Sequence, residues 1–218
     1  MKKLQKYGED RQMIFQETWD KYCNIVGGTG NRADYCKVLY DYADSLSANS
    51  VILEIGTMSG GSAVCFASAL ENRNCHIYTI DPAFLSNEEL KKQHNRVVIN
   101  DVLSNQVDST YNNVRNWIDS TPFKDNITLI AGFSEDVYKD WDKGAIIDMI
   151  YIDGCHTYEA VLKDMEWVNY LKPKGLLVMD DWIQPVEQAM KEWNEKHNNI
   201  LVDTQSTHTR WPLSFRKS

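Results

Sequence analysis

Mostly apolar runs rich in β-branched residues alternate along this chain with longer segments of mixed polarity. Such runs occupy residues 51–55, 76–80, 127–130, 146–152 and 176–179. They are continuous rather than alternating, which is typical of strands covered on both faces, and the segments between them can each hold a helix. The pattern therefore predicts an α/β fold of the doubly wound, Rossmann-like type, built on a mostly parallel sheet.

The segments around these strands predict further elements. Residues 9–23 and 33–45 show roughly helical spacing of apolar positions, and the glycine-rich stretch 27–30 between them is typical of a flexible connector. The polar stretch 86–120 is longer than one crossover helix requires, so we expect an extra helix or a lid there.

The chain has 218 residues, the size of one domain. We therefore expect a single domain over residues 1–218, with leading helices at about 9–45 and a core at about 51–182. The tail predicts a helix at about 186–197 and strands at 200–202 and near 213–215.

The charge balance limits the kinds of partner. Acidic residues outnumber basic ones by 31 to 23, which gives a formal net charge of −8 and argues against nucleic acid. No apolar run is long enough to cross a bilayer, and the first residues do not form a signal peptide. The five cysteines are irregularly spaced and indicate free thiols. We expect a soluble cytoplasmic protein with a small-molecule or saccharide substrate and no membrane partner. Whether two copies form a homodimer stays open.

A glycine turn follows the first strand, in the sequence Glu54-Ile55-Gly56-Thr57-Met58-Ser59-Gly60-Gly61-Ser62. In an open α/β sheet, ligands bind beyond the carboxyl ends of the strands. Gly56 permits a sharp exit from the strand, Gly60 and Gly61 allow a ligand to approach bare backbone, and amides at a helix N-terminus hold anions. The spacing fits neither the dinucleotide fingerprint nor the phosphate loop.

This Glu-x-Gly-x-x-x-Gly turn resembles motif I of class I methyltransferases, which holds the amino-acid end of S-adenosylmethionine. The resemblance implies a seven-stranded sheet with an antiparallel last strand, a cofactor carboxylate bonded by Ser62, and Glu54 as support beneath the turn. Asp81, at the end of the second strand, is suited to the ribose hydroxyls, and Phe133, Ser134 and Glu135 resemble the adenine-flanking segment. The predicted cofactor-binding residues are Glu54, Gly56, Met58, Gly60, Ser62, Asp81, Ser134, Glu135 and Asp153. Without Asp81 and the third-strand segment, such a turn is as often only a tight connection.

Three carboxylates follow two neighbouring strands: Asp153 ends the fourth, and Asp180 and Asp181 end the fifth. Carboxylates gathered in one crevice repel one another unless they are protonated or bridged by a cation. Oxygen ligands favour Mg²⁺, Mn²⁺ or Ca²⁺ over zinc. Acidic pairs at strand ends also occur as helix caps and as solvated surface charge.

The layout is similar to metal-dependent O-methyltransferases such as catechol O-methyltransferase. It is closer to the macrolide-sugar O-methyltransferases and the cephalosporin hydroxylase group, through the turn Asp153-Gly154-Cys155-His156-Thr157-Tyr158 and the Asp180-Asp181 ending. The likeness covers about residues 51–182 and implies Asp153, Asp180 and Asp181 as ligands of Mg²⁺, with Asp153 and His156 catalytic and His156 the general base. His156 could instead pack beside Tyr158 or bind the metal directly. Trp182 is a candidate wall of the acceptor pocket.

These features predict a methyltransferase of the EC 2.1.1 class. A divalent ion lowers the pKa of a bound hydroxyl, His156 removes its proton, and the oxygen attacks the sulfonium methyl in line. The expected acceptor is a hydroxyl of a sugar, glycan or glycosylated natural product. A catechol or amine acceptor, or a hydroxylase-like enzyme on the same scaffold, is the alternative.

Overall fold

A seven-stranded sheet forms the centre of the protein, in the order β3-β2-β1-β4-β5-β7-β6. The computed structural model describes residues 15–17, 19–23, 33–92, 111–141, 146–203 and 212–218. The strands are β1 (Val51–Ile55), β2 (His76–Asp81), β3 (Ile127–Ala131), β4 (Ile147–Ile152), β5 (Leu171–Met179), β6 (Leu201–Asp203) and β7 (Leu213–Lys217). β7 is antiparallel to both of its neighbours, and the pairs from β3 to β5 are parallel. The predicted Rossmann-like sheet with an antiparallel last strand is confirmed.

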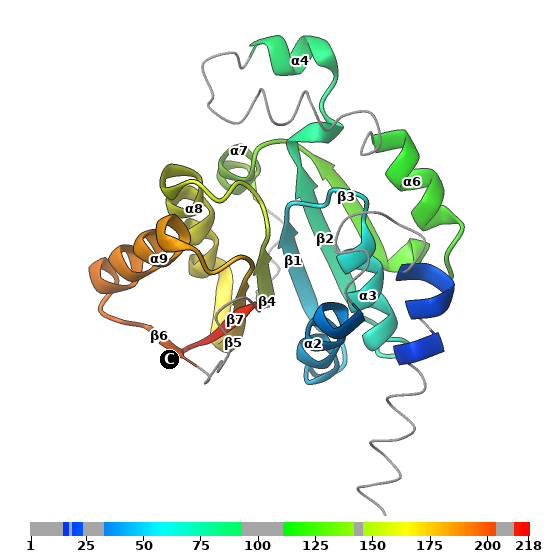
Figure 1. The fold of residues 1–218 in the computed structure, drawn as a ribbon, viewed down its shortest axis with the longest axis horizontal. Helices are drawn as coiled ribbons and strands as arrows, with labels where there is room; N and C mark the ends of the chain where they lie inside the picture. Colours follow the sequence, from blue (N-terminus) through cyan, green and yellow to red (C-terminus); the bar gives the residue numbers. More distant parts are fainter. Residues whose placement is uncertain (1–14, 18, 24–32, 93–110, 142–145, 204–211) are drawn as a thin grey trace, which may run out of the picture.

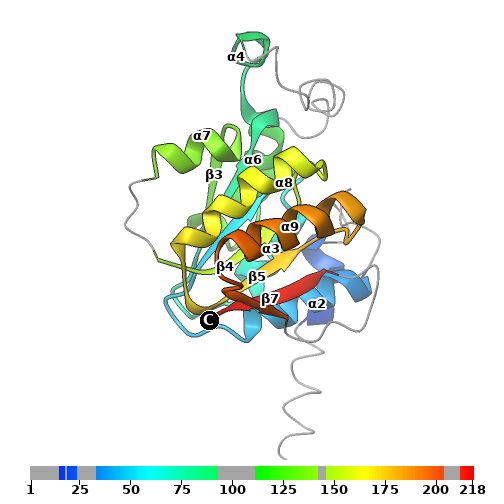
Figure 2. The same cartoon turned by 90° about the vertical axis from the view of Figure 1, so that its left-hand side faces the viewer.

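Helices cover both faces of the sheet (Figure 1). On one side lie α2 (Ala33–Asp44), α3 (Gly61–Ala69) and α6 (Tyr111–Asp119), and on the other lie α7 (Ser134–Lys139), α8 (Tyr158–Asp164) and α9 (Gln184–Lys196). Figure 2 shows α8 and α9 side by side over the sheet. The short helix α4 (Asn87–Lys92) stands off the body beyond the end of β2 in both views.

The central strands β1 and β4 are mostly apolar because both of their faces are buried. Every residue of β4 is buried. Met149 and Tyr151 belong to the core cluster under α2 and α3, whereas Ile150 and Ile152 belong to the cluster on the opposite side. Successive side chains of a strand point to opposite faces, so each core takes alternate residues of the same strand.

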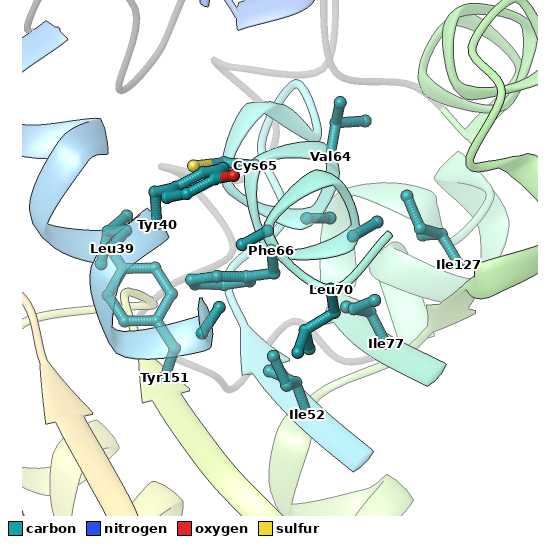
Figure 3. Packing of buried hydrophobic residues seen from close by; sticks show 14 of the residues in the cluster. Leu39, Tyr40, Ile52, Val64, Cys65, Phe66, Leu70, Ile77, Ile127 and Tyr151 are labelled. Carbon is teal, nitrogen blue, oxygen red and sulfur yellow. The ribbon is translucent and has the colours of Figure 1, made fainter. Parts of the chain in front are cut away.

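Helix α3 is the middle element of the first core, and all nine of its residues are buried. A helix that is apolar on every side needs neighbours on every side. Figure 3 shows Phe66 of this helix beside Tyr151 of β4, with Leu39 of α2 on the same side of Phe66 as the Tyr151 ring. The Phe66 and Tyr151 rings meet edge to face with centroids 5.6 Å apart.

Most element boundaries agree with the expected ones within about two residues, with two clear differences. β5 begins at Leu171 rather than 176, because Leu171 pairs with Ile147 before a shift in register. The helix expected over residues 9–23 is described only in part, and its last five residues, Trp19–Cys23, form a π-helix. The stretch 86–120 contains two helices, α4 and α6, and its residues 93–110 lie outside the described residues. The predicted connector 27–30 also lies outside the described residues.

The described cysteines, Cys36, Cys65, Cys75 and Cys155, are free thiols, as expected. Within the described ranges, no helix has the combined length and apolar character needed to span a membrane.

Candidate active site

The strand order reverses between β1 and β4, and the turns that follow these two strands are in direct contact. The Asp153 amide donates to the Ile55 carbonyl at 2.8 Å. Gly56 has φ +94°, and a Cβ placed on it would lie 2.1 Å from the Asp153 carbonyl oxygen. Gly56 is therefore required for the close approach of the two turns, at the switch point where doubly wound sheets bind ligands.

Gly60 serves the packing of a helix. It caps α3 with φ +86°, and a Cβ there would lie 3.1 Å from the Trp117 side chain and 3.2 Å from that of Val114. The bare side of this glycine faces α6, which differs from the expectation that it faces a ligand. Met58 lies within the turn at φ +46°, and it is 55% exposed.

Asp81 holds the turn in place. Its Oδ2 accepts hydrogen bonds from the amides of Thr57 (3.0 Å) and Met58 (2.9 Å), and its Oδ1 accepts from the Ala83 amide at 2.8 Å. Burial raises the pKa of Asp81, and these three amides act in the opposite direction. A carboxylate has about four acceptor positions, so capacity for one ribose hydroxyl remains. The ribose role stays a prediction.

Glu54 is fully buried beneath the turn, and its predicted supporting role stays a prediction. It accepts hydrogen bonds from the hydroxyls of Ser62 and Thr79. Burial raises the pKa of Glu54 to about 7. The Ser62 hydroxyl, expected to bond the cofactor, donates to Glu54 in this structure, so its cofactor role stays a prediction.

The segment after β3 is tied to α8. The Ser134 hydroxyl donates to the Asp164 carboxylate, and Glu135 forms an ion pair with Lys163 at 3.0 Å. Burial raises the pKa of Asp164 to about 7. Sequence reasoning missed Asp164, because nothing in the pattern of α8 distinguishes it from a surface acid. The adenine roles of Ser134 and Glu135 remain predictions.

Three potential ligands meet at the ends of β4 and β5. Asp153, His156 and Asp180 each offer one ligand atom within 4.8 Å of the others, and we call these residues the acidic cluster. His156 Nε2 lies 3.7 Å from Asp153 Oδ1, and although this nitrogen is buried it has no hydrogen-bond partner among the described residues. A buried nitrogen without a partner costs free energy, and a cation between it and the two carboxylates would remove that cost. The donor set therefore fits a divalent ion.

Asp181 lies outside this cluster, although the sequence interpretation made it a ligand. Its φ of +41° turns the chain, and its side chain is 59% exposed. Its Oδ2 lies 3.8 Å from His156 Nδ1. The structure thus brings together two of the three predicted ligands, with His156 in the third place. Trp182 is partly buried and lies against Phe215, with ring centroids 5.7 Å apart.

Two tyrosines contact the cluster from the α2 and α3 side. The Tyr35 hydroxyl donates to Asp180, and the Tyr151 hydroxyl donates to Asp153 at 3.0 Å. Burial raises the pKa of both tyrosines well above the ordinary value, so both hydroxyls keep their protons near neutral pH. Sequence reasoning missed this pair: Tyr151 was assigned only to a strand, and Tyr35 is 145 positions from Asp180.

Comparison with known proteins assigns this arrangement to a family. A family described as a methyltransferase domain matches residues 53–182, which include the glycine turn, Asp81 and the acidic cluster. The chain belongs to this methyltransferase family. The leading helices, α9 and the strands β6 and β7 lie outside the matched residues.

Solved O-methyltransferase structures share the fold. TomG from Streptomyces achromogenes, in complex with S-adenosylmethionine, is 16% identical with a TM-score of 0.59, over 85% of this chain and 81% of TomG. The Bacillus cereus O-methyltransferase bound to S-adenosylhomocysteine is 15% identical with a TM-score of 0.61, over 94% and 90% of the two chains. CalS11, a TDP-rhamnose 3'-O-methyltransferase of calicheamicin biosynthesis, is 15% identical with a TM-score of 0.51, over 83% and 76%. At these identities the likeness establishes the fold.

Proposed function

We propose that this methyltransferase transfers the methyl group of S-adenosylmethionine to a hydroxyl of a sugar, glycan or glycosylated natural product, assisted by a divalent ion, with Mg²⁺ expected. The observation that carries the proposal is the acidic cluster with its buried His156 Nε2, set against the glycine turn of a methyltransferase. The sugar acceptor is supported by CalS11, which shares the fold and methylates a rhamnose.

The donor would lie along the glycine turn. Met58 offers an exposed side chain there, and the Asp81 carboxylate has acceptor capacity for a ribose hydroxyl. The contact between Gly56 and Asp153 fixes the distance between the turn and the acidic cluster. Donor and acceptor would thus be held close and aligned, which is the main contribution of a protein to a direct transfer.

Asp153, Asp180 and His156 would hold the ion. His156 Nε2 faces the carboxylates, and Asp181 lies on the side of Nδ1. A metal-binding histidine commonly has a carboxylate at its second ring nitrogen, which orients the ring. This supports direct binding by His156 over the base role, because Nε2 is buried and faces the two carboxylates.

The reaction forms a bond between the acceptor oxygen and the methyl carbon and breaks the bond between that carbon and sulfur. When bound, the ion would lower the pKa of an acceptor hydroxyl, as it lowers that of water from 15.7 to about 7. The oxygen then attacks the methyl carbon in line while the carbon–sulfur bond breaks, giving a methyl ether and S-adenosylhomocysteine, and the hydroxyl proton passes to solvent. Asp153 and Asp180 keep the acceptor in line with the sulfur.

A methyl-transfer assay tests the proposal. Chelator-treated enzyme is supplied with labelled S-adenosylmethionine and a panel of nucleotide sugars, glycosylated polyketides, catechols and amines, with and without Mg²⁺. We expect label on a sugar hydroxyl only with Mg²⁺. Full activity in EDTA would contradict the role of the ion. Label found only on catechols or amines would contradict the sugar acceptor. A product heavier by one oxygen atom would indicate a hydroxylase.

The role of His156 is decided by a second measurement. If His156 binds the ion, His156→Ala weakens Mn²⁺ binding by at least about 10-fold. If it is instead the base, Mn²⁺ affinity is retained and the turnover number falls by about 10²- to 10⁴-fold.

A further inference from the structure

Each carboxylate of the acidic cluster accepts a hydrogen bond from one of two adjacent tyrosine hydroxyls. The Tyr35 hydroxyl donates to Asp180, and the Tyr151 hydroxyl donates to Asp153 Oδ2 at 3.0 Å. The two hydroxyl oxygens are 2.9 Å apart. Four oxygen atoms thus lie in sequence from one carboxylate to the other, and the side chains that carry them come from α2, β4 and the end of β5.

The positions of both tyrosines are fixed by the packing of the core. Tyr151 is fully buried in β4, two residues before Asp153, with its ring against Phe66 (Figure 3). Tyr35 is 5% exposed and lies one helical turn before Leu39, which is fully buried, so both belong to the face of α2 that packs on α3. Neither hydroxyl can move away without displacing this core.

We propose that the Tyr35–Tyr151 hydroxyl pair positions Asp153 and Asp180 for binding one cation, which makes helix α2 a part of the metal site. The inference rests on the proposed function. Carboxylates that bind metals are generally held by hydrogen bonds from neighbouring groups, which set their orientation. Two like charges would otherwise separate toward solvent, and each hydroxyl holds one of them in place.

A purely structural role for the pair has a different consequence. Phenylalanine keeps the ring, its volume and its contacts with α3, so a Tyr→Phe change retains the apolar packing at each position. If the hydroxyls only satisfied buried hydrogen bonds, their removal would alter thermal stability and leave the affinity for a cation unchanged. Metal affinity therefore separates positioning from packing.

The test measures Mn²⁺ binding to the chelator-treated full chain, through the electron paramagnetic resonance signal of free Mn²⁺. We expect Tyr35→Phe and Tyr151→Phe each to weaken binding by about 10- to 100-fold. The double variant should lose less than the product of the two effects, because the two hydroxyls are 2.9 Å apart and act on the same cation site. The control is Tyr40→Phe, since Tyr40 is equally buried on α2 and packs against Phe15 at 5.3 Å.

S-adenosylhomocysteine binding, measured by calorimetry on the same proteins, completes the design. It should change by less than about 3-fold in every variant, since the tyrosines act on the cation and not on the donor. Mn²⁺ binding by Tyr35→Phe equal to that of Tyr40→Phe would overturn the positioning role while the proposed function stands. A wild-type chain that binds the donor but no Mn²⁺ at millimolar concentration would overturn both the ion assistance and this inference.

Discussion

The Asp81 carboxylate accepts a hydrogen bond of 2.9 Å from the backbone amide of Met58, 23 residues earlier in the chain. The bond ties the end of β2 to the glycine turn after β1. Because Asp81 also accepts from Thr57 and Ala83, one side chain sets the path of two turns. The shape of the donor site therefore depends on the charge of a single buried carboxylate.

Replacing Asp81 by asparagine should affect both stability and donor binding. We expect Asp81→Asn to lower the free energy of unfolding by about 2 kcal/mol, since hydrogen bonds to a charged acceptor are lost. S-adenosylhomocysteine affinity should fall by about 10-fold, corresponding to about 1.4 kcal/mol. Chemical denaturation and calorimetry measure the two effects.

Asp44 provides the matched control for Asp81. It is also buried and accepts a hydrogen bond from Arg73, but it is the last residue of α2 and lies outside the glycine turn. Asp44→Asn should destabilise the chain without weakening donor binding. Equal losses of affinity in the two variants would show that Asp81 acts only through general stability.

The two glycines beside the acidic cluster should differ in their tolerance of a methyl group. Gly56→Ala combines a left-handed φ with a Cβ 2.1 Å from the Asp153 carbonyl, and should cost about 3 kcal/mol or more in unfolding free energy. Gly154→Ala meets its nearest neighbour, the Ile55 side chain, at 3.4 Å and should cost less than about 1 kcal/mol. Similar denaturation midpoints for the two variants would contradict the close approach of the turns.

Asp164 should make stability depend on pH. Burial raises its pKa from 3.8 to about 7 in the folded chain, so its contribution to stability is fully present below about pH 4 and is lost as the pH rises through 7. A difference of about three pKa units corresponds to at most about 4 kcal/mol. Asp164→Asn keeps an acceptor for Ser134 and cannot ionise.

Unfolding free energies at pH 4 and pH 8 measure this effect. We expect the wild type to lose more stability than Asp164→Asn over this interval, by up to about 4 kcal/mol. Identical pH dependence in the two proteins would mean that Asp164 is ionised in the fold at neutral pH.

The neighbouring aspartates 180 and 181 should differ in their effect on metal binding. Asp180 belongs to the acidic cluster, whereas the Asp181 side chain is 59% exposed and faces His156 Nδ1. Asp180→Asn should weaken Mn²⁺ binding by about 100-fold and Asp181→Asn by no more than about 10-fold, as expected for a ligand and for an orienting partner. Calorimetry on chelator-treated protein measures both, and a larger loss at 181 would restore the ligand set expected from the sequence.

The fold was predictable because buried parallel strands have a simple signature. Mostly apolar runs such as that of β4 must be covered on both faces, so the sheet is predicted to lie between two layers of helices. Parallel neighbours end at one edge of the sheet, so Asp153 and Asp180 could be placed together without coordinates.

Other features depend on contacts that the pattern does not encode. Asp181 lies outside the cluster, on the Nδ1 side of His156, at a turn where its φ is +41°. Tyr35 reaches the site through the docking of α2 on α3, a contact set by the packing of the whole core. Ser62 was assigned to a ligand, whereas Glu54, eight residues earlier, accepts its hydrogen bond in the fold.

The central claim is that the methyl donor and the cation lie side by side at the ends of β1 and β4. Bound Mn²⁺ accelerates the magnetic relaxation of nearby protons, so the S-methyl resonance of S-adenosylmethionine reports this distance directly. We predict strong relaxation of the S-methyl protons in the wild-type complex and its loss in Asp153→Asn. An unaffected S-methyl resonance, with donor and Mn²⁺ both bound to the chain, would contradict the account.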